Sequence, residues 1–208
     1  MAYRITPDGL LDTYGATYAQ EAGITLRDKP APLYQLLVLT MLSSIRISAD
    51  TAARAASELF RAGWRTPTHL LESTWQERVD ALGRGGYRRY DESTADYLAQ
   101  QAEQVRDRLH GDLRRLTPDD RGGVPALRKA LQEFPRIGPT GSAIFCREVQ
   151  AVWPTVRPFF DTRARRAATQ LGYPSDPHEL ADLVGPQRTA VFSAALVRWS
   201  LDRSARKR

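Results

Sequence analysis

The chain has 208 residues, of which 42% are hydrophobic and 26% charged, and it carries a formal net charge of +6 with a sequence pI near 9.8. This composition is typical of a globular protein with a sizeable core, and it excludes global disorder. No apolar run approaches the roughly 20 residues of a membrane helix, and the first residues lack the basic-then-apolar order of a signal peptide. We therefore expect a soluble, cytoplasmic protein without a membrane partner, whose positive charge favours a polyanion such as nucleic acid.

Residue types that bind metals or act as nucleophiles are scarce. Cys146 is the only cysteine, which excludes an internal disulfide, a cysteine-based zinc site and a cysteine-ligated iron–sulfur cluster. The three histidines lie far apart and show no metal-ligand spacing, so we expect no metal site. Only three of the 30 basic residues are lysines, which leaves few candidates for a lysine nucleophile: Lys29, Lys129 and Lys207.

Apolar residues recur with a period near 3.6, punctuated by Pro and Gly, and no run alternates as a strand would. The chain is therefore predicted to be all-α. A first core helix follows residues 29–32, buries one face, and ends near Ser43 and Ser44; Gly63 ends the next helix. Thr66 and Ser73-Thr74 are typical helix starts. The expected helices are residues 33–43, 51–60, 67–72, 74–82 and 91–110, with a Gly- and Arg-rich loop at 82–89.

The most informative segment is residues 126–149. It predicts a helix to about Gln132, a short turn over 134–138, and a second helix from Pro139 or Thr140 onwards. The unpaired amides at the start of that second helix carry partial positive charge and suit a phosphate. Gly138 leaves room for an anion beside the backbone, and a Pro at a helix start loses no hydrogen bond. An ordinary helical hairpin without a ligand is the alternative interpretation.

This segment resembles the hairpin of the endonuclease III-like helix-hairpin-helix superfamily of DNA glycosylases. Residues 134–138, Phe-Pro-Arg-Ile-Gly, match the family's Leu-Pro-Gly-Val-Gly, and residues 160–163, Phe-Asp-Thr-Arg, match its Val-Asp-Thr-His. Upstream, residues 36–60 resemble the family's early helix, DNA-facing loop and following helix, and residues 86–89 resemble its second DNA-facing loop. The resemblance covers residues 30–172 in order.

The resemblance implies a fold of two helical lobes. A helical barrel of residues 30–152 would contain the helix-hairpin-helix at about 126–150. Residues 1–29 and 153–208 would form the second lobe, which carries Asp161, and DNA would lie across the cleft between the lobes. The last residues, 203–208, are expected to be a disordered basic tail that adds non-specific DNA affinity.

The resemblance also implies a chemistry. Members that cut the strand attack the sugar with a lysine, but the matching position here is Thr140, whose hydroxyl cannot form an imine. We therefore expect a monofunctional glycosylase in which Asp161 stabilises positive charge on the sugar and orients or deprotonates water. A helix N-cap is the alternative or additional role of Asp161. The arginines that follow it at 163, 165 and 166 are expected to hold it ionised. We expect no cofactor, with a monovalent cation at the hairpin left open.

Flipping a base out of the duplex requires DNA contacts from several segments. Ile45 stands where the family has its glutamine wedge, and it is either an apolar wedge or, with Ile47, a core residue. Arg136 stands where the family usually has glycine. The arginine loop contacts DNA or is merely solvated. The expected DNA-binding residues are Arg136, Ile137, Gly138, Pro139, Thr140 and Gly141 in the hairpin, Ile45 and Arg46, then Arg84, Tyr87, Arg88 and Arg89, and finally Arg163 and Arg166.

The sequence thus predicts a monomeric, nucleoid-associated enzyme that excises a damaged or mispaired base from double-stranded DNA. One alternative is a DNA-binding protein that keeps the hairpin but has lost catalysis. A bifunctional glycosylase and AP-lyase with another amine is disfavoured by the scarcity of lysine. Aromatic residues that either stack on the flipped base or belong to the core are Tyr34, Trp64, Tyr87, Trp153, Phe159 and Phe160.

Overall fold

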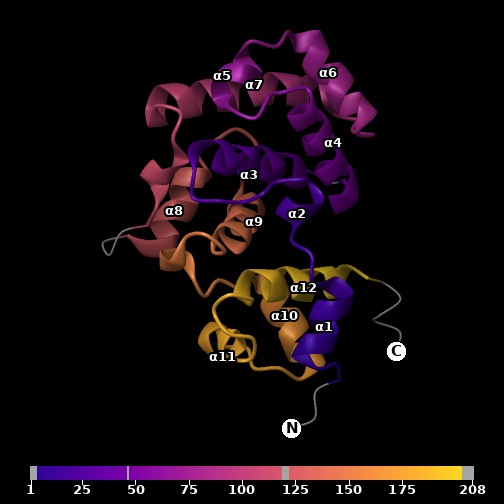
Figure 1. Ribbon diagram of the computed structural model, residues 1–208, viewed down its shortest axis with the longest axis vertical. Helices are drawn as coiled ribbons and strands as arrows, with labels where there is room; N and C mark the ends of the chain where they lie inside the picture. The colour runs from indigo at the N-terminus through magenta and orange to yellow at the C-terminus, as the bar shows by residue number, and fades with distance from the viewer. Residues whose placement is uncertain (1–3, 46, 119–121, 203–208) are drawn as a thin grey trace. The chain divides into compact units, whose positions relative to one another are not determined.

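The computed structural model describes residues 4–45, 47–118 and 122–202. Arg46 and the basic tail at 203–208 lie outside these residues. Over the described ranges the chain folds into helices joined by loops, without a β-strand, which confirms the all-α prediction (Figure 1). No helix in these ranges is long and apolar enough to cross a membrane.

The chain divides into two compact units. The central unit is Tyr18–Phe145, and the terminal unit combines Met1–Thr17 with Cys146–Arg208. These boundaries differ from the expected ones in two respects. Residues 18–29 belong to the central unit because the short helix α2 (Tyr18–Glu21) packs against α4 (Ala49–Arg61). The second boundary lies inside α9 (Pro139–Val149) rather than after residue 152, since the end of that helix bonds to terminal-unit residues.

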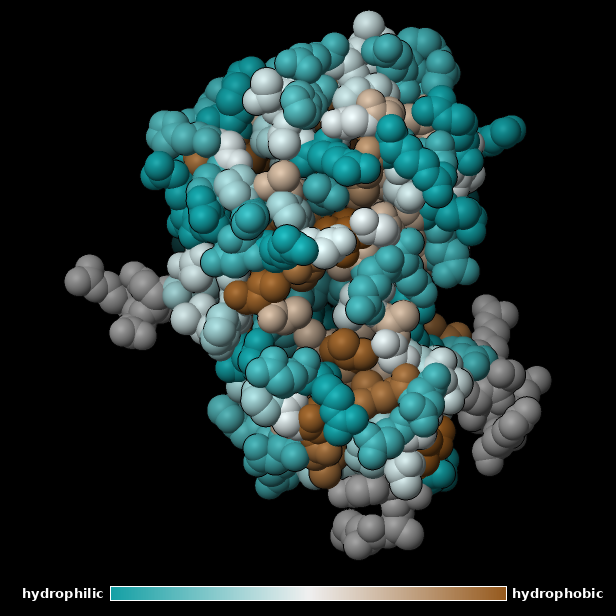
Figure 2. All heavy atoms as spheres, in the orientation of Figure 1, coloured by the Kyte–Doolittle hydropathy of each residue, from teal (hydrophilic) through white to brown (hydrophobic). Residues whose placement is uncertain are grey.

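The central unit is built around α3 (Pro30–Ser43), which α4 flanks (Figure 1). The sequence predicted one buried face, but residues 36–42 of α3 are buried on every side, as in a helix enclosed by its neighbours. On the face seen in Figure 2, mainly hydrophilic side chains cover the outer helices of this unit. Its remaining elements are α5 (Pro67–Leu71), α6 (Trp75–Arg84), α7 (Asp91–Leu109), the 3₁₀ turn η1 (Leu113–Leu116) and α8 (Gly123–Leu131).

Local sequence chemistry explains where these helices begin. Ser48 and Thr66 each cap a helix, because the side-chain hydroxyl accepts a hydrogen bond from the backbone N–H three residues further on, that of Thr51 and His69 respectively. Thr74 forms a reciprocal capping box with Glu77 at the start of α6. The predicted helix starts at Thr66 and Thr74 are therefore confirmed.

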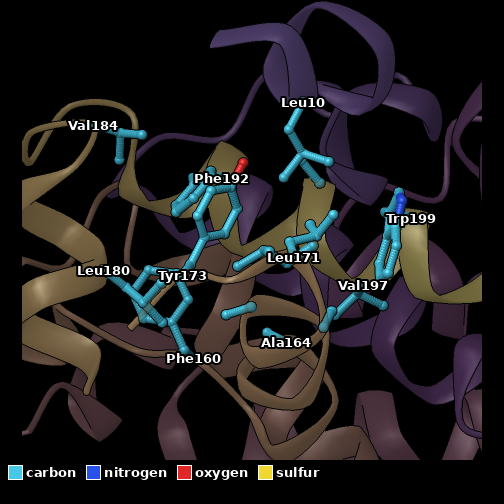
Figure 3. Packing of buried hydrophobic residues seen from close by; sticks show 14 residues of the cluster. Leu10, Phe160, Ala164, Leu171, Tyr173, Leu180, Val184, Phe192, Val197 and Trp199 are labelled. Carbon is cyan, nitrogen blue, oxygen red and sulfur yellow. The ribbon is translucent and has the colours of Figure 1, made fainter. Parts of the chain in front are cut away.

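The terminal unit combines helices from the beginning and from the last part of the sequence. In it α12 (Thr189–Leu201) packs against both α1 (Pro7–Tyr14) and α10 (Thr162–Leu171), beside the shorter α11 (Pro177–Asp182) and the 3₁₀ turn η2 (Pro154–Val156). Figure 3 shows the shared core, in which Leu10 of α1 joins Leu171 and Phe192. Phe160 packs edge-on against Phe192, with ring centroids 6.2 Å apart. The segment that leads into Asp161 is thus anchored by a buried aromatic residue.

Candidate nucleic-acid interface and carboxylate site

The hairpin joins α8 to α9 through a tight turn. Its hydrogen bonds run from Phe134 N to Leu131 O and from Ile137 N to Phe134 O, each 3.2 Å long. Arg136 has a φ of 60°, the left-handed conformation that favours glycine. The turn therefore takes a left-handed backbone conformation that favours glycine, although an arginine occupies the position. The Arg136 guanidinium lies over the Tyr97 ring of α7, 4.8 Å from its centroid.

A residue that the sequence analysis did not single out, Arg128 of α8, holds the two helices of the hairpin together. Its Nη2 donates to Pro139 O at 3.0 Å, and its Nε donates to Ser142 Oγ at 3.2 Å. Ser142 Oγ in turn donates to Pro139 O at 3.0 Å. The only sequence signal was a basic residue in the last turn of α8, which does not by itself indicate a partner on α9.

The start of α9 presents free amides, as predicted. Ser142 N donates to Gly138 O at 2.9 Å, which makes this the first bond of the helix. Within the described part of the chain the amides of Gly138, Thr140 and Gly141 donate no hydrogen bond. Thr140 and Pro139 are exposed. A Cβ built on Gly138 would meet nothing within 4 Å, so packing does not require glycine here.

Gly141 has a different reason for being glycine. It is buried, and a Cβ on it would lie 2.4 Å from Ser44 Oγ and 3.2 Å from Ile137 Cγ2. Gly141 therefore lets α9 approach the end of α3 closely. Ile137, only 3% exposed, packs at the same place, so most of its side chain supports the turn.

An open groove of about 580 Å³ runs along the hairpin within the central unit. Ser44 and Ile45 at the end of α3 line one part of it, and Tyr90 before α7 lines another. Ile45 is half-buried and lines this groove, and its role as a wedge stays a prediction. The structure thus brings the predicted wedge loop and the hairpin to one groove. The hairpin residues that line it are Gln132, Phe134, Arg136, Ile137 and Gly138.

Only some side chains of the second predicted DNA-facing loop are available to contact DNA. Arg88 and Arg89 are exposed, and the Arg89 guanidinium lies 5.4 Å from the centroid of the Tyr90 ring. Arg84 pairs with Glu58, with 3.2 Å between Nε and Oε2, and its hydrogen bond is the largest cause that lowers the pKa of Glu58. Tyr87 is 1% exposed, so the prediction that its side chain contacts DNA is wrong. Burial of its ring in the core of this unit also raises its pKa.

Asp161 lies in the terminal unit at the start of α10. Its Oδ1 accepts a hydrogen bond from Ala164 N at 2.9 Å, which confirms the N-cap interpretation. Its Oδ2 accepts a hydrogen bond from Arg147 Nη1 at 2.7 Å. The Asp161 side chain remains 13% exposed. One carboxylate thus combines a capping bond, a charge-assisted bond and access to solvent.

Arg147 is the ion-pair partner that sequence reasoning missed. The arginines after Asp161 were expected to supply the positive charge, but Arg163 and Arg166 are exposed and Arg165 donates to Ser175 O at 2.9 Å. Charge comes instead from the far end of α9, fourteen residues earlier in the chain. The available signal was Arg147-Glu148 itself, a charged pair inside an otherwise apolar helical run.

Gln150 and Ser193 hold the backbone just before Asp161. The Gln150 carboxamide forms two hydrogen bonds with the backbone of Phe159, as a peptide group would. Its Nε2 donates to Phe159 O and its Oε1 accepts from Phe159 N, both at 2.8 Å. Ser193 of α12 also donates to Phe159 O at 3.1 Å. Asp161 therefore sits on a segment fixed from two neighbouring elements.

Most of the aromatic residues proposed to stack on a base belong to the core. Tyr34, Trp153 and Phe160 are 0%, 1% and 5% exposed. Trp64 and Phe159 keep partial exposure. The core interpretation therefore holds for the three buried residues, as it does for Tyr87.

No group of three or more His, Cys, Asp or Glu side chains in the described ranges has an arrangement that could hold a metal ion. Cys146, the single cysteine of the sequence, is buried in α9. The chain therefore does not offer the four thiolates that a cysteine-ligated iron–sulfur cluster needs.

Comparison with solved structures places this arrangement in a known fold. The chain is similar to endonuclease III in the structure of a trapped endonuclease III–DNA covalent intermediate, an estranged-adenine complex, with a TM-score of 0.53. The match covers 93% of this chain and 82% of that chain, at 17% sequence identity. No protein-family model matches the sequence, and no curated protein does. The chain has an endonuclease III-like, all-α fold.

Proposed function

We propose that this protein is a DNA glycosylase that binds double-stranded DNA as a monomer and hydrolyses the N-glycosidic bond of a flipped, damaged or mispaired base. The observation that carries the proposal is Asp161, a carboxylate fixed at a helix start in an endonuclease III-like fold. Support for DNA binding comes from the free amides at α9 and from the groove that the hairpin shares with Ile45. A monovalent cation at the hairpin stays a prediction.

The Asp161 carboxylate keeps acceptor positions that the reaction can use. An ionised carboxylate has about four acceptor positions, and the two hydrogen bonds from Ala164 and Arg147 occupy one on each oxygen. The remaining positions are free to hold a water molecule or to face positive charge developing on the sugar. Because the carboxylate is already fixed, little reorganisation is needed as that charge develops.

The proposed reaction uses water as the nucleophile. Thr140 stands at the position matched to the strand-cleaving lysine, and no lysine lies between Gly138 and Asp161. Borohydride added during reaction with a duplex that carries the base to be excised, or with a duplex that carries an abasic site, should therefore trap no covalent adduct. A trapped adduct would refute the monofunctional assignment.

Asp161→Asn tests catalysis. It keeps the side chain's shape and its capping oxygen but removes the negative charge, so single-turnover base release should fall at least about 1,000-fold. DNA affinity should change by less than about twofold. The substrate panel comprises alkylated, oxidised, deaminated and mismatched duplexes, and Asp176→Asn, which caps α11 in the same way, is the matched control.

A second candidate function is DNA binding without base excision. It is favoured by the same bonds at Asp161, since both of its oxygens already serve the structure. Wild-type protein that binds duplex DNA but releases no base from the whole panel would establish this function and exclude the glycosylase.

A further inference from the structure

The hydrogen bonds around Asp161 assign a positioning role to Arg147, a residue of α9 that lies outside the matched stretches 134–138 and 160–163. We propose that Arg147 fixes the direction of the Asp161 carboxylate, and that base release depends on this bond. The catalytic part of the proposal rests on the proposed glycosylase function, whereas the bond itself does not.

Burial makes the pairing strong. The Arg147 side chain is 3% exposed, and its Nη1 lies 2.7 Å from Asp161 Oδ2. A guanidinium so deeply buried requires anionic partners, because an uncompensated buried charge is very unfavourable. Glu148, 1% exposed, supplies a second carboxylate, with 3.7 Å between its Oε1 and Arg147 Nε. The arginine therefore lies between two buried or nearly buried carboxylates.

The geometry distinguishes positioning from simple stabilisation. The capping bond from Ala164 N holds only Oδ1, so a carboxylate with that bond alone could still pivot about Oδ1 and change the direction of Oδ2. The bond from Arg147 holds Oδ2 and removes this freedom. Together the two bonds determine where the free lone pairs of Asp161 point.

The backbone supports the same inference. The Gln150 side chain, three residues after Arg147, donates to Arg147 O at 3.0 Å. It also hydrogen-bonds to both the backbone N–H and the backbone C=O of Phe159. The end of α9 therefore fixes the main chain before Asp161 through one side chain and the carboxylate through another.

Two variants of Arg147 separate its charge from its geometry. Arg147→Lys keeps the charge but replaces the planar guanidinium by a compact ammonium group, which fixes the direction of the carboxylate less well. Single-turnover base release should therefore fall about 10- to 100-fold at unchanged DNA affinity. Arg147→Met removes the charge between two carboxylates and should lower the midpoint of thermal unfolding by roughly 10 °C. Arg165→Met is the control, because Arg165 is exposed and bonds only a backbone carbonyl. It should leave both readouts unchanged.

Double variants and spectroscopy test the bond without reference to activity. Asp161→Asn should fold, since Glu148 still offsets the charge of Arg147, and Arg147→Met combined with Asp161→Asn should regain at least half of the stability that Arg147→Met loses. In ¹⁵N-labelled protein the Arg147 Nη resonances should exchange slowly with solvent in wild type and rapidly in Asp161→Asn.

The outcomes separate this proposal from the proposed function. If Arg147→Lys releases base at the wild-type rate, or if the resonances and the stability cycle show no coupling to Asp161, the positioning role is refuted. If wild type releases no base from any duplex, the glycosylase assignment fails, and the resonances and the stability cycle alone then decide whether Arg147 holds Asp161.

Discussion

Gly141→Ala tests how the hairpin is seated on the central unit. The new Cβ would lie 2.4 Å from Ser44 Oγ, whereas ordinary contacts are 3.4–4 Å, so the hydroxyl must move by about 1 Å or more. Ser44 Oγ donates to Thr40 O at 2.7 Å, and this movement breaks the bond. The substitution therefore acts through one identifiable atom.

The expected size follows from three contributions. Loss of the Ser44 hydrogen bond costs about 1 kcal/mol, and overpacking costs about 1–3 kcal/mol. Replacing a glycine in a helix by alanine gives a gain of about 1 kcal/mol. The free energy of unfolding should thus fall by about 1–3 kcal/mol, which lowers the unfolding midpoint of a protein of this size by roughly 2–12 °C.

Ser44→Ala supplies the matched background for the measurement. It removes Oγ, after which the nearest atom to the new Cβ is Ile137 Cγ2 at 3.2 Å. In that background Gly141→Ala should be nearly neutral, so urea unfolding of the four proteins should give a coupling of about 1–3 kcal/mol. An equal cost of Gly141→Ala in both backgrounds would refute the contact between α9 and the end of α3.

Three further results are expected. Gly138→Val should weaken binding to every duplex about 10-fold and reduce the dependence of affinity on salt concentration, without lowering stability, because its Cβ would meet nothing in the protein. Titration at several salt concentrations checks this, and unchanged affinity would exclude the hairpin from the DNA interface. The free energy of unfolding of Arg136→Gly, measured in urea, should exceed that of Arg136→Ala by about 1 kcal/mol, because the φ of 60° strains alanine. Alanine is usually the more stabilising of the two residues, and that usual order would mean that the turn has another shape. Glu58→Gln should tighten DNA binding about two- to fivefold at low salt by releasing Arg84, whereas Asp107→Asn, which makes the same charge change elsewhere, should not. The hydrogen bond from Arg84 lowers the pKa of Glu58, so the competing carboxylate persists at neutral pH and is lost only as pH falls below that lowered pKa; equal binding by wild type and Glu58→Gln at neutral pH would contradict the competition.

The sequence alone determined the local features of this protein. The 3.6-residue period and the caps at Thr66 and Thr74 predicted the helix class and several helix starts, because both act over one or two turns. The Pro-x-x-Gly turn likewise predicted two helices and free amides at the second one. The resemblance of residues 134–138 and 160–163 to endonuclease III-like proteins predicted the fold that the structural comparison bears out.

Only the tertiary structure decided which side chains face outwards and which pair. Tyr87 follows a glycine-rich loop with arginines, which reads as an exposed segment, yet its ring is buried. Gly138 and Gly141 look alike in the sequence, but only Gly141 is required by packing, since its neighbour Ser44 comes from a helix almost a hundred residues earlier.

Asp161 shows the same division. Its place before a helical run predicted the N-cap, because a capping bond spans three residues and depends on local sequence alone. Its pairing with Arg147 could not be predicted in this way, since the arginine lies on another helix and the bond forms only once the fold brings the two side chains together. Adjacent arginines were the natural sequence candidates for its counter-charge. Burial, which depends on the whole fold, selected a distant one.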